Sequence, residues 1–204
     1  MPPLVDPNLA QTWAELYQVK KASDPNVWAA GYVRDCSIYT AAVSDAAGII
    51  AALGINSTHK VGVIGAAYGW LSNQIALQSG CVIAAVDTST YIQSGKAVNA
   101  DITILNADIS TGSGRTAVRQ ALGITGQNKA SFMITEDVLP TLSDAECTQL
   151  STFLHNLSDT VVHWLTLLDQ GGNQDPRLNW KNAAGWKALL PGDFFIKRSG
   201  SVLL

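Results

Sequence analysis

Two glycines and one aspartate have the spacing of a nucleoside-binding site. Gly65 and Gly69 form a turn between an apolar run at 61–64 and a helical pattern that starts at Trp70. Glycines at such a turn let the backbone approach a ligand closely, and the first N–H groups of the helix stay free to donate hydrogen bonds. Asp87 ends the next apolar run, about 20 positions further on, where a carboxylate is placed to accept both hydroxyls of a ribose. The glycine pair alone is a common structural turn, but together with Asp87 it favours a nucleoside site.

The elements around these residues alternate between strand and helix. Short, continuously apolar segments separated by helical patterns are typical of a parallel sheet that is covered on both faces. The predicted strands cover 60–64, 81–86, 102–105, 131–135 and 160–168, and the helices that alternate with them cover 70–78, 115–122, 144–157 and 179–190. Three further helices are predicted upstream, at 9–19, 27–39 and 41–53. The sequence therefore predicts an α/β fold with the glycine turn at the end of its first strand.

The helix at 144–157 has the clearest local signature in the chain. Ser143 and Glu146 have the spacing of a capping box, and Leu142 and Cys147 have the spacing of a hydrophobic staple. These residues predict where the helix starts, and they carry no chemistry.

The C-terminal residues follow a different pattern. Two apolar segments, 194–198 and 201–204, flank the dipeptide Ser199-Gly200. A two-residue turn of this kind between two strand-like segments predicts an antiparallel β-hairpin.

Composition limits the kind of protein. The chain has 204 residues, of which 47% are hydrophobic and 14% charged, with a formal net charge of −3. These values predict a single domain over 1–204, with an N-terminal helical cap at 1–54 and an α/β core at 60–204. The basic residues are scattered and form no stripe that would neutralise phosphates. A small-molecule or protein partner is therefore favoured over a nucleic acid, and the oligomeric state is left open.

Three features of the sequence predict the cellular location of the protein. The longest uninterrupted apolar run, 81–86, is far shorter than the roughly 20 residues of a membrane span. The N-terminal residues lack the basic and apolar regions of a secretory signal. Cys36, Cys81 and Cys147 are odd in number and widely spaced, which predicts buried free thiols over a disulfide or a metal site. We therefore expect a cytoplasmic protein without a membrane segment.

Residues 60–168 resemble the class I S-adenosylmethionine-dependent methyltransferases, and the C-terminal hairpin adds to the likeness. In that family the first strand leads into a loop with the pattern acidic-x-Gly-x-Gly-x-Gly. This chain keeps Gly65 and Gly69, whereas Val63 stands at the acidic position and Ala67 at the middle glycine. The resemblance implies a three-layer Rossmann-like fold with a seven-stranded, mainly parallel sheet that ends in an antiparallel hairpin. It also implies S-adenosylmethionine as the cofactor.

The resemblance assigns cofactor contacts to the strand ends. Asp87 would bind the ribose, Asp108 would meet the adenine amino group, and Ile109 would pack on the adenine ring. From the residues alone, Asp108 is explained equally well as an Asx-turn residue. Tyr32 and Tyr39 would cover the sulfonium from the N-terminal helices through a cation–π contact, with plain helix packing as the alternative. The full set of implied cofactor-binding positions is Gly65, Ala67, Tyr68, Gly69, Asp87, Thr88, Asp108, Ile109, Tyr32 and Tyr39.

Methyl transfer from a sulfonium needs alignment of the reactants, and it needs a base only when the acceptor must lose a proton. Segment 132–140 resembles the fourth-strand end, which borders the reacting methyl group in the family. Asp137 and Glu136 are therefore the first candidates for a catalytic base. His163 is the third candidate, and its apolar neighbours fit a buried core histidine equally. None of the three histidines has ligand spacing to another, so no metal site is predicted. The acceptor stays open.

Val63 and Ala67 leave two alternative functions open. Valine at the acidic position offers only apolar packing, so we expect the side chains of Tyr68 and Trp70 to hold the loop. We expect the lid formed by Tyr32 or Tyr39 to compensate in part for the cofactor affinity lost with the acid. The first alternative is a methyltransferase-like protein that serves as a non-catalytic binding or scaffold protein. The second is an NAD-dependent oxidoreductase, which is disfavoured because Ala66 and Ala67 crowd the approach of a pyrophosphate. A P-loop is also disfavoured, because no Walker motif is present.

Overall fold

The computed structural model describes residues 37–66, 69–88, 102–165, 167 and 179–197. The predicted helix at 9–19, most of the predicted helix at 27–39 and the segment 201–204 lie outside these residues.

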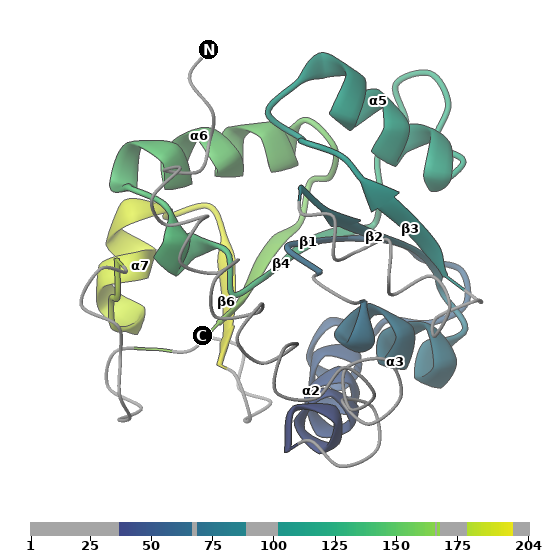
Figure 1. The fold of residues 1–204 in the computed structure, drawn as a ribbon, viewed down its shortest axis with the longest axis horizontal. Helices are drawn as coiled ribbons and strands as arrows, with labels where there is room; N and C mark the ends of the chain where they lie inside the picture. The colour runs from purple at the N-terminus through teal and green to yellow at the C-terminus, as the bar shows by residue number, and fades with distance from the viewer. Residues whose placement is uncertain (1–36, 67–68, 89–101, 166, 168–178, 198–204) are drawn as a thin grey trace, which may run out of the picture.

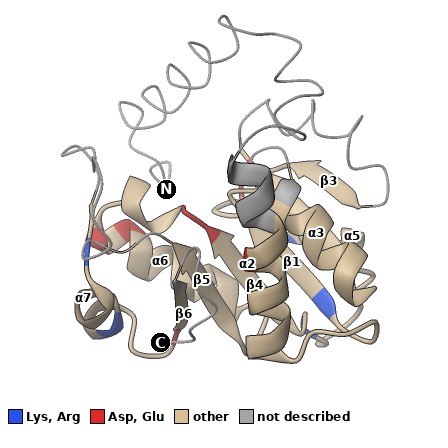
Figure 2. Ribbon diagram, turned by 90° about the horizontal axis from the view of Figure 1, so that it is seen from below, with Lys and Arg blue, Asp and Glu red and all other residues tan. Residues whose placement is uncertain are grey.

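The described residues form one sheet of six parallel strands (Figure 1). The strands are β1 (Lys60–Ile64), β2 (Val82–Asp87), β3 (Thr103–Asn106), β4 (Phe132–Glu136), β5 (Val161–Leu165) and β6 (Phe194–Lys197), in the order β3-β2-β1-β4-β5-β6. Every strand predicted between 60 and 168 is present. Charged residues occur only at the strand ends (Figure 2), because both faces of the sheet are covered.

Helices pack on both faces of the sheet and make three layers (Figure 1). α2 (Ser37–Leu53) and α3 (Trp70–Ser79) cover one face, while α5 (Gly112–Ala121), α6 (Asp144–His155) and α7 (Ala183–Leu189) cover the other. The sheet thus separates two hydrophobic cores. The core under α2 and α3 includes Val61, Val63, Ala85 and Ile134, and the core under α5, α6 and α7 includes Val86, Met133, Leu150 and Trp186.

The last described strand departs from the prediction. β6 pairs with β5 in parallel, with Val162 opposite Phe194 and Leu165 opposite Lys197. The described sheet therefore has six parallel strands, where seven with an antiparallel hairpin were predicted. The reason is α7, which lies between β5 and β6 in the chain, since a helical crossover makes neighbouring strands parallel. The second arm of the predicted hairpin, 201–204, lies outside the described residues, so the described sheet contains the first arm alone and no antiparallel strand.

The described cysteines are buried free thiols. Cys81 and Cys147 are both buried and unbridged, as predicted, and Cys36 lies outside the described residues. Burial raises the pKa of the Cys147 thiol to about 12, so this thiol stays protonated at neutral pH. No helix in the described part of the chain is both long and apolar enough to cross a membrane.

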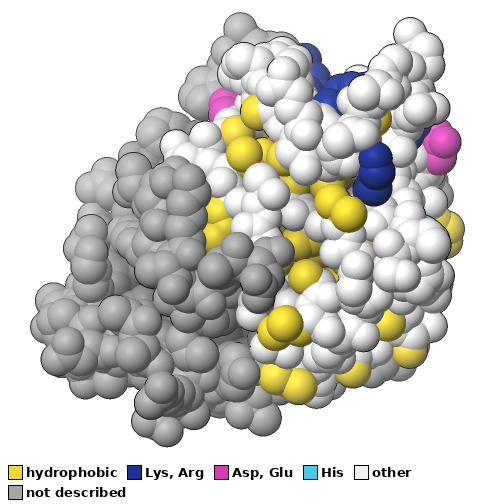
Figure 3. Space-filling view, turned by 90° about the vertical axis from the view of Figure 1, so that its right-hand side faces the viewer, with side chains coloured by type: hydrophobic (Ala, Val, Ile, Leu, Met, Phe, Trp, Pro, Cys, Tyr) yellow, Lys and Arg dark blue, Asp and Glu magenta, His cyan; other side chains and the backbone are white. Residues whose placement is uncertain are grey.

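Several basic side chains bind backbone carbonyls. Lys60 Nζ donates to the carbonyl of Gly123 at 2.7 Å, and Arg115 Nη1 donates to the carbonyl of Ile109 at 2.8 Å. The Arg115 guanidinium also lies 4.6 Å from the centre of the Phe153 ring. On the face drawn in Figure 3, the few Lys and Arg side chains form no continuous stripe. These cations serve the fold of the loops that they bind.

The start of α6 confirms the predicted capping box. The Ser143 Oγ accepts from the backbone N–H of Glu146, and the Glu146 carboxylate accepts from the backbone N–H of Ser143 at 2.8 Å. Cys147, Leu150 and Leu154 then face the core as one buried stripe. The cap matters for the site, because α6 begins directly after the loop that follows β4.

Replacing Ser143 by alanine should lower the free energy of unfolding by about 1 kcal/mol, because it leaves a first-turn N–H of α6 without its acceptor. Denaturant titration followed by circular dichroism measures this loss. The matched control is Ser57→Ala, at an exposed position in the turn before β1. It should shift the unfolding midpoint far less, and equal shifts in the two variants would contradict the role of the cap.

Candidate functional site

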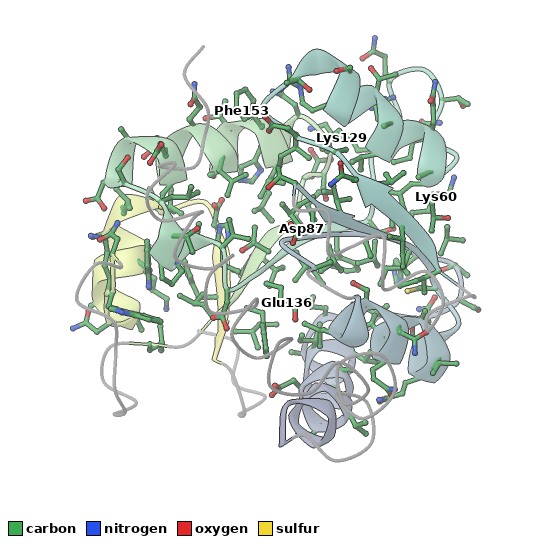
Figure 4. All side chains as sticks on the ribbon, viewed as in Figure 1. Lys60, Asp87, Lys129, Glu136 and Phe153 are labelled. Carbon is green, nitrogen blue, oxygen red and sulfur yellow. The ribbon has the colours of Figure 1, made fainter. Side chains whose placement is uncertain are left out.

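The candidate site lies at the carboxyl edge of the sheet. Chain order reverses at β1, which has β2 on one side and β4 on the other. In open parallel sheets, ligands bind outside the carboxyl ends of the strands at such a switch point. Asp87 ends β2 and Glu136 ends β4, so the two carboxylate-bearing ends flank the end of β1 (Figure 4).

Gly65 shapes this edge by a close contact between two loops. Its backbone has φ +77°, and its N–H donates to the carbonyl of Val86 at 2.9 Å. A Cβ at this position would overlap Val138 Cγ2 and would lie 2.9 Å from the carbonyl oxygen of Glu136. The loop after β4 therefore packs directly on the turn after β1, and only glycine leaves room for that contact.

Gly69 forms the entry to α3. It is the N-cap residue with φ +77° and makes no side-chain cap hydrogen bond, while its own N–H donates to the carbonyl of Ala66 at 2.6 Å. Because glycine has no side chain, the N-cap residue itself leaves the N–H groups at the start of the helix unoccupied. The structure places the predicted glycine turn between β1 and α3, as expected. Ala67 and Tyr68 lie outside the described residues.

Val63 is fully buried and packs in the core under α2 and α3. It lies beside Ala85 of β2 and Ile134 of β4, so an apolar layer occupies the place where the family carries a carboxylate. Three polar residues of α2 and α3 are also buried: Asp45, Ser72 and Gln74. The predicted apolar packing of Val63 is confirmed. The predicted packing of Tyr68 and Trp70 on the loop stays a prediction, because the structure describes neither Tyr68 nor the Trp70 side chain.

Asp87 and its neighbours make the part of the edge that was predicted to bind ribose. Asp87 is half-buried and Thr88 is exposed. Asn106, at the end of β3, is in register with Asp87, and its side-chain N–H donates to the Asp87 carbonyl at 3.3 Å. Sequence reasoning missed Asn106, although a polar residue that ends an apolar strand beside Asp87 was a visible signal.

Asp108 and Ile109 both interact within the fold near the end of β3, and their predicted contacts with adenine stay predictions. The Asp108 Oδ1 accepts from the backbone N–H of Ser110 at 2.8 Å, which is the geometry of an Asx-turn. Its carbonyl accepts from the N–H and the hydroxyl of Thr111, the N-cap residue of α5. Ile109 is buried in the core under α5 and α6, so its side chain does not lie at the open edge.

Glu136 and Asp137 stand beside the glycine turn. Both are half-buried, and the N–H of Asp137 donates to the carbonyl of Trp164 at 2.9 Å. Asp137 has φ +49°, which among the described residues is otherwise the conformation of glycines. A non-glycine residue in this region stores of order 1 kcal/mol of strain, and such strain clusters at functional sites.

His163 lies inside the molecule. Its side chain is fully buried on the α6 face of the sheet. The Nδ1 lies 2.8 Å from the Thr135 hydroxyl, and the Nε2 lies 2.7 Å from Asp193 Oδ2. Both ring nitrogens are therefore engaged within the core, and the structure does not bring His163 together with Glu136 and Asp137 at the open edge. This geometry fits the core-histidine interpretation.

The two lid tyrosines are not placed. Tyr32 lies outside the described residues, and Tyr39 is described only as backbone within α2.

No protein-family model and no curated protein matches the sequence. Solved structures do match the fold. Magnesium protoporphyrin IX methyltransferase from Synechocystis PCC 6803, with S-adenosylmethionine bound, is 17% identical, with 76% of this chain and 69% of that chain covered, at a TM-score of 0.51. Human N-acetylserotonin methyltransferase in complex with S-adenosylmethionine is 15% identical, with coverages of 78% and 49%, at a TM-score of 0.55.

A third similar structure is phosphoethanolamine N-methyltransferase 1 from Haemonchus contortus, in complex with phosphoethanolamine and S-adenosylhomocysteine. It is 14% identical, with 91% of this chain and 41% of that chain covered, at a TM-score of 0.57. The chain thus spans less than half the length of the human and nematode enzymes. At these identities the likeness concerns the fold: the chain has the Rossmann-like fold of the class I S-adenosylmethionine-dependent methyltransferases.

Replacing Gly65 by alanine tests the contact between the two loops. Gly54→Ala is the matched control, because Gly54 has φ +65° and a Cβ there would meet nothing within 4 Å. Both variants carry backbone strain of about 1 kcal/mol, but only Gly65→Ala should lose a further 1–3 kcal/mol or so from overlap with Val138. Val138→Ala should restore part of that loss in the double variant. Equal unfolding midpoints for the two glycine variants would contradict the contact.

Proposed function

We propose that the chain binds S-adenosylmethionine at the carboxyl edge of β1, β2 and β4 and transfers its methyl group to a small-molecule or protein acceptor. One observation carries the proposal: the Gly65 turn ends β1 between the carboxylate-bearing ends of β2 and β4. Solved structures with the same fold include methyltransferases with S-adenosylmethionine bound, which supports this assignment.

The residues at this edge fit the chemistry of that cofactor. S-adenosylmethionine supplies a methyl group on a positively charged sulfonium. The Asp87 carboxylate would bind the ribose hydroxyls, with Thr88 and Asn106 beside it. The start of α3, where the N-cap residue Gly69 has no side chain, would offer N–H groups to an anionic group of the ligand.

Glu136 and Asp137 would face the acceptor. The packing of Val138 on Gly65 ties their loop to the glycine turn, so a ligand on the turn and an acceptor beside the loop would be held in fixed relation. Either carboxylate would take the proton of an acceptor that must lose one. The buried position of His163 favours the two acids as the base.

Other sequence predictions stay part of this proposal. Three of them concern residues that the structure describes in part or not at all. They are the lid role of Tyr32 and Tyr39, the contacts of Ala67 and Tyr68, and the single domain with its helical cap at 1–54. A cytoplasmic location is proposed from the free, buried state of Cys81 and Cys147.

A non-catalytic binding or scaffold protein is the second candidate function. Its supporting observation is Val63, which is fully buried in an apolar layer and gives the glycine turn no carboxylate. The loss of one charge-assisted hydrogen bond is worth about 1.5–3 kcal/mol, so cofactor affinity is expected to be lower than in proteins that keep the acid.

Isothermal titration with S-adenosylhomocysteine and, separately, with NAD tests the proposal. Asp87→Asn should weaken S-adenosylhomocysteine binding roughly tenfold to a hundredfold, because the amide loses the charge that strengthens the bond to the ribose. The matched control is Asp159→Asn, since the Asp159 side chain is 85% exposed and pairs with Lys129. This control should leave the affinity unchanged.

Equal affinity in Asp87→Asn and the wild type would mean that the ribose lies elsewhere. Binding of NAD with no binding of S-adenosylhomocysteine would support the oxidoreductase. The absence of both would support the scaffold protein.

A further inference from the structure

A buried carboxylate joins three elements far from the glycine turn. Asp193 directly precedes β6, and its side chain is only 1% exposed. Its Oδ2 lies 2.7 Å from His163 Nε2 of β5, and its Oδ1 lies 2.7 Å from His155 Nε2 at the end of α6. The Ser151 hydroxyl of α6 donates to the same carboxylate. Asp193 thus connects α6, β5 and the start of β6.

The hydrogen bonds determine where the protons sit. An ionised carboxylate only accepts, so His163 carries its proton on Nε2 and donates it to Asp193. In the neutral imidazole the His163 Nδ1 is then an acceptor, and the Thr135 hydroxyl of β4, 2.8 Å away, is its donor. A neutral imidazole and an ionised carboxylate therefore satisfy every hydrogen bond in the chain Thr135–His163–Asp193.

The surroundings favour that pair of states. Burial lowers the pKa of His163, although the neighbouring Asp193 carboxylate acts in the opposite direction. Burial alone would raise the pKa of Asp193, but the hydrogen bonds from His163, Ser151 and His155 outweigh it and hold that pKa below its usual value. The folded protein thus keeps His163 neutral and Asp193 charged at neutral pH.

The groups that face this pair come from every element packed on it. α6 contributes His155 and Ser151, β4 contributes Thr135, and β6 contributes the Phe195 ring, whose centre lies 5.3 Å from that of His163. Near the surface, Lys129 Nζ donates to the carbonyl of His155 and pairs with Asp159 at 2.6 Å. His155 is the charged or titratable neighbour on the side that is open to solvent, with its side chain 36% exposed.

β6 depends on this anchor. The strand has four residues and pairs only with β5 within the described sheet. The N–H of Asp193 also donates to the carbonyl of Leu190, directly after α7, at 3.1 Å. Asp193 therefore adds a polar anchor to the apolar packing of Trp186 and Phe195, which holds α7 and β6 on the same core.

We propose that Thr135, His163 and Asp193 form a proton-operated latch, which stabilises the packing of α7 and β6 on the sheet at neutral pH and weakens on acidification, so that this segment opens more often. When the segment opens, His163 is exposed to water and returns toward its ordinary pKa of 6.5. Below that pH the open form binds one proton more than the closed form, so stability of the closed form is present above pH 6.5 and is lost as the pH falls. The lowered pKa of Asp193 acts in the same direction at lower pH.

Amide hydrogen exchange of the full-length chain tests the latch. Between about pH 6.5 and about pH 5, the protection factors of Phe194–Lys197 should fall by up to about tenfold per pH unit, the change expected for uptake of one proton. The amides of β1 and β2 should keep their protection. His163→Gln should remove the pH dependence, because a glutamine amide can still donate to Asp193 and accept from Thr135 without titrating. His59→Gln is the matched control, because it removes a histidine directly before β1. In this variant the protection of β6 should keep its pH dependence.

Two outcomes would overturn the latch. One is the same pH dependence of β6 protection in His163→Gln and in the wild type, and the other is loss of β1 and β6 protection together on acidification. Nitrogen NMR of the wild-type imidazole provides a measurement that needs no variant. The folded protein should show the Nε2–H tautomer of His163 well below pH 6.5, and titration of this ring at its ordinary pKa would equally refute the proposal.

Discussion

The candidate site depends on the contact of Val138 and the Glu136 carbonyl with Gly65. The contact brings together loops that follow strands far apart in the sequence, at the place where the order of strands reverses. The absence of a side chain at position 65 thus determines how closely the loop after β4 packs on the turn after β1. A bulkier residue would push the loop after β4 outward, and this loop contains Asp137 with its left-handed backbone at φ +49°.

Hydrogen bonds and apolar packing have separate roles in this arrangement. Val63, Ala85 and Ile134 pack together in the core under α2 and α3, at neighbouring positions of β1, β2 and β4. The Asp87 and Glu136 carboxylates are placed at strand ends, where both residues are half-buried. The described part of the chain therefore supports its glycine turn from below by hydrophobic contacts, which explains how the fold tolerates valine where the family carries an acid.

The sequence predicted the elements well where a local signal coincided with the global fold. β1 has the predicted bounds, and α6 begins at its capping box, because alternation and capping are read within a few residues. The direction of β6 was beyond such signals, since it depends on how the α7 crossover returns the chain to β5. The same limit applies to the site. Asp87 and Glu136 were found as strand ends, whereas Ile109 and His163 were assigned by position in the chain without knowledge of which face of the sheet each side chain would occupy.

The pairing of β1 with β4 also has a consequence for synthesis of the chain. The N–H of Lys60 donates to the Ser131 hydroxyl at 3.1 Å, across a separation of 71 positions. A ribosome that adds about 5–20 residues per second needs on the order of ten seconds to make that interval. Throughout this time one hydrogen-bonding edge of the central, apolar strand has no neighbour, and unpaired strand edges recruit other chains. The nascent protein is therefore most exposed to aggregation before β4 leaves the exit tunnel, and chaperone binding during that interval would protect the edge.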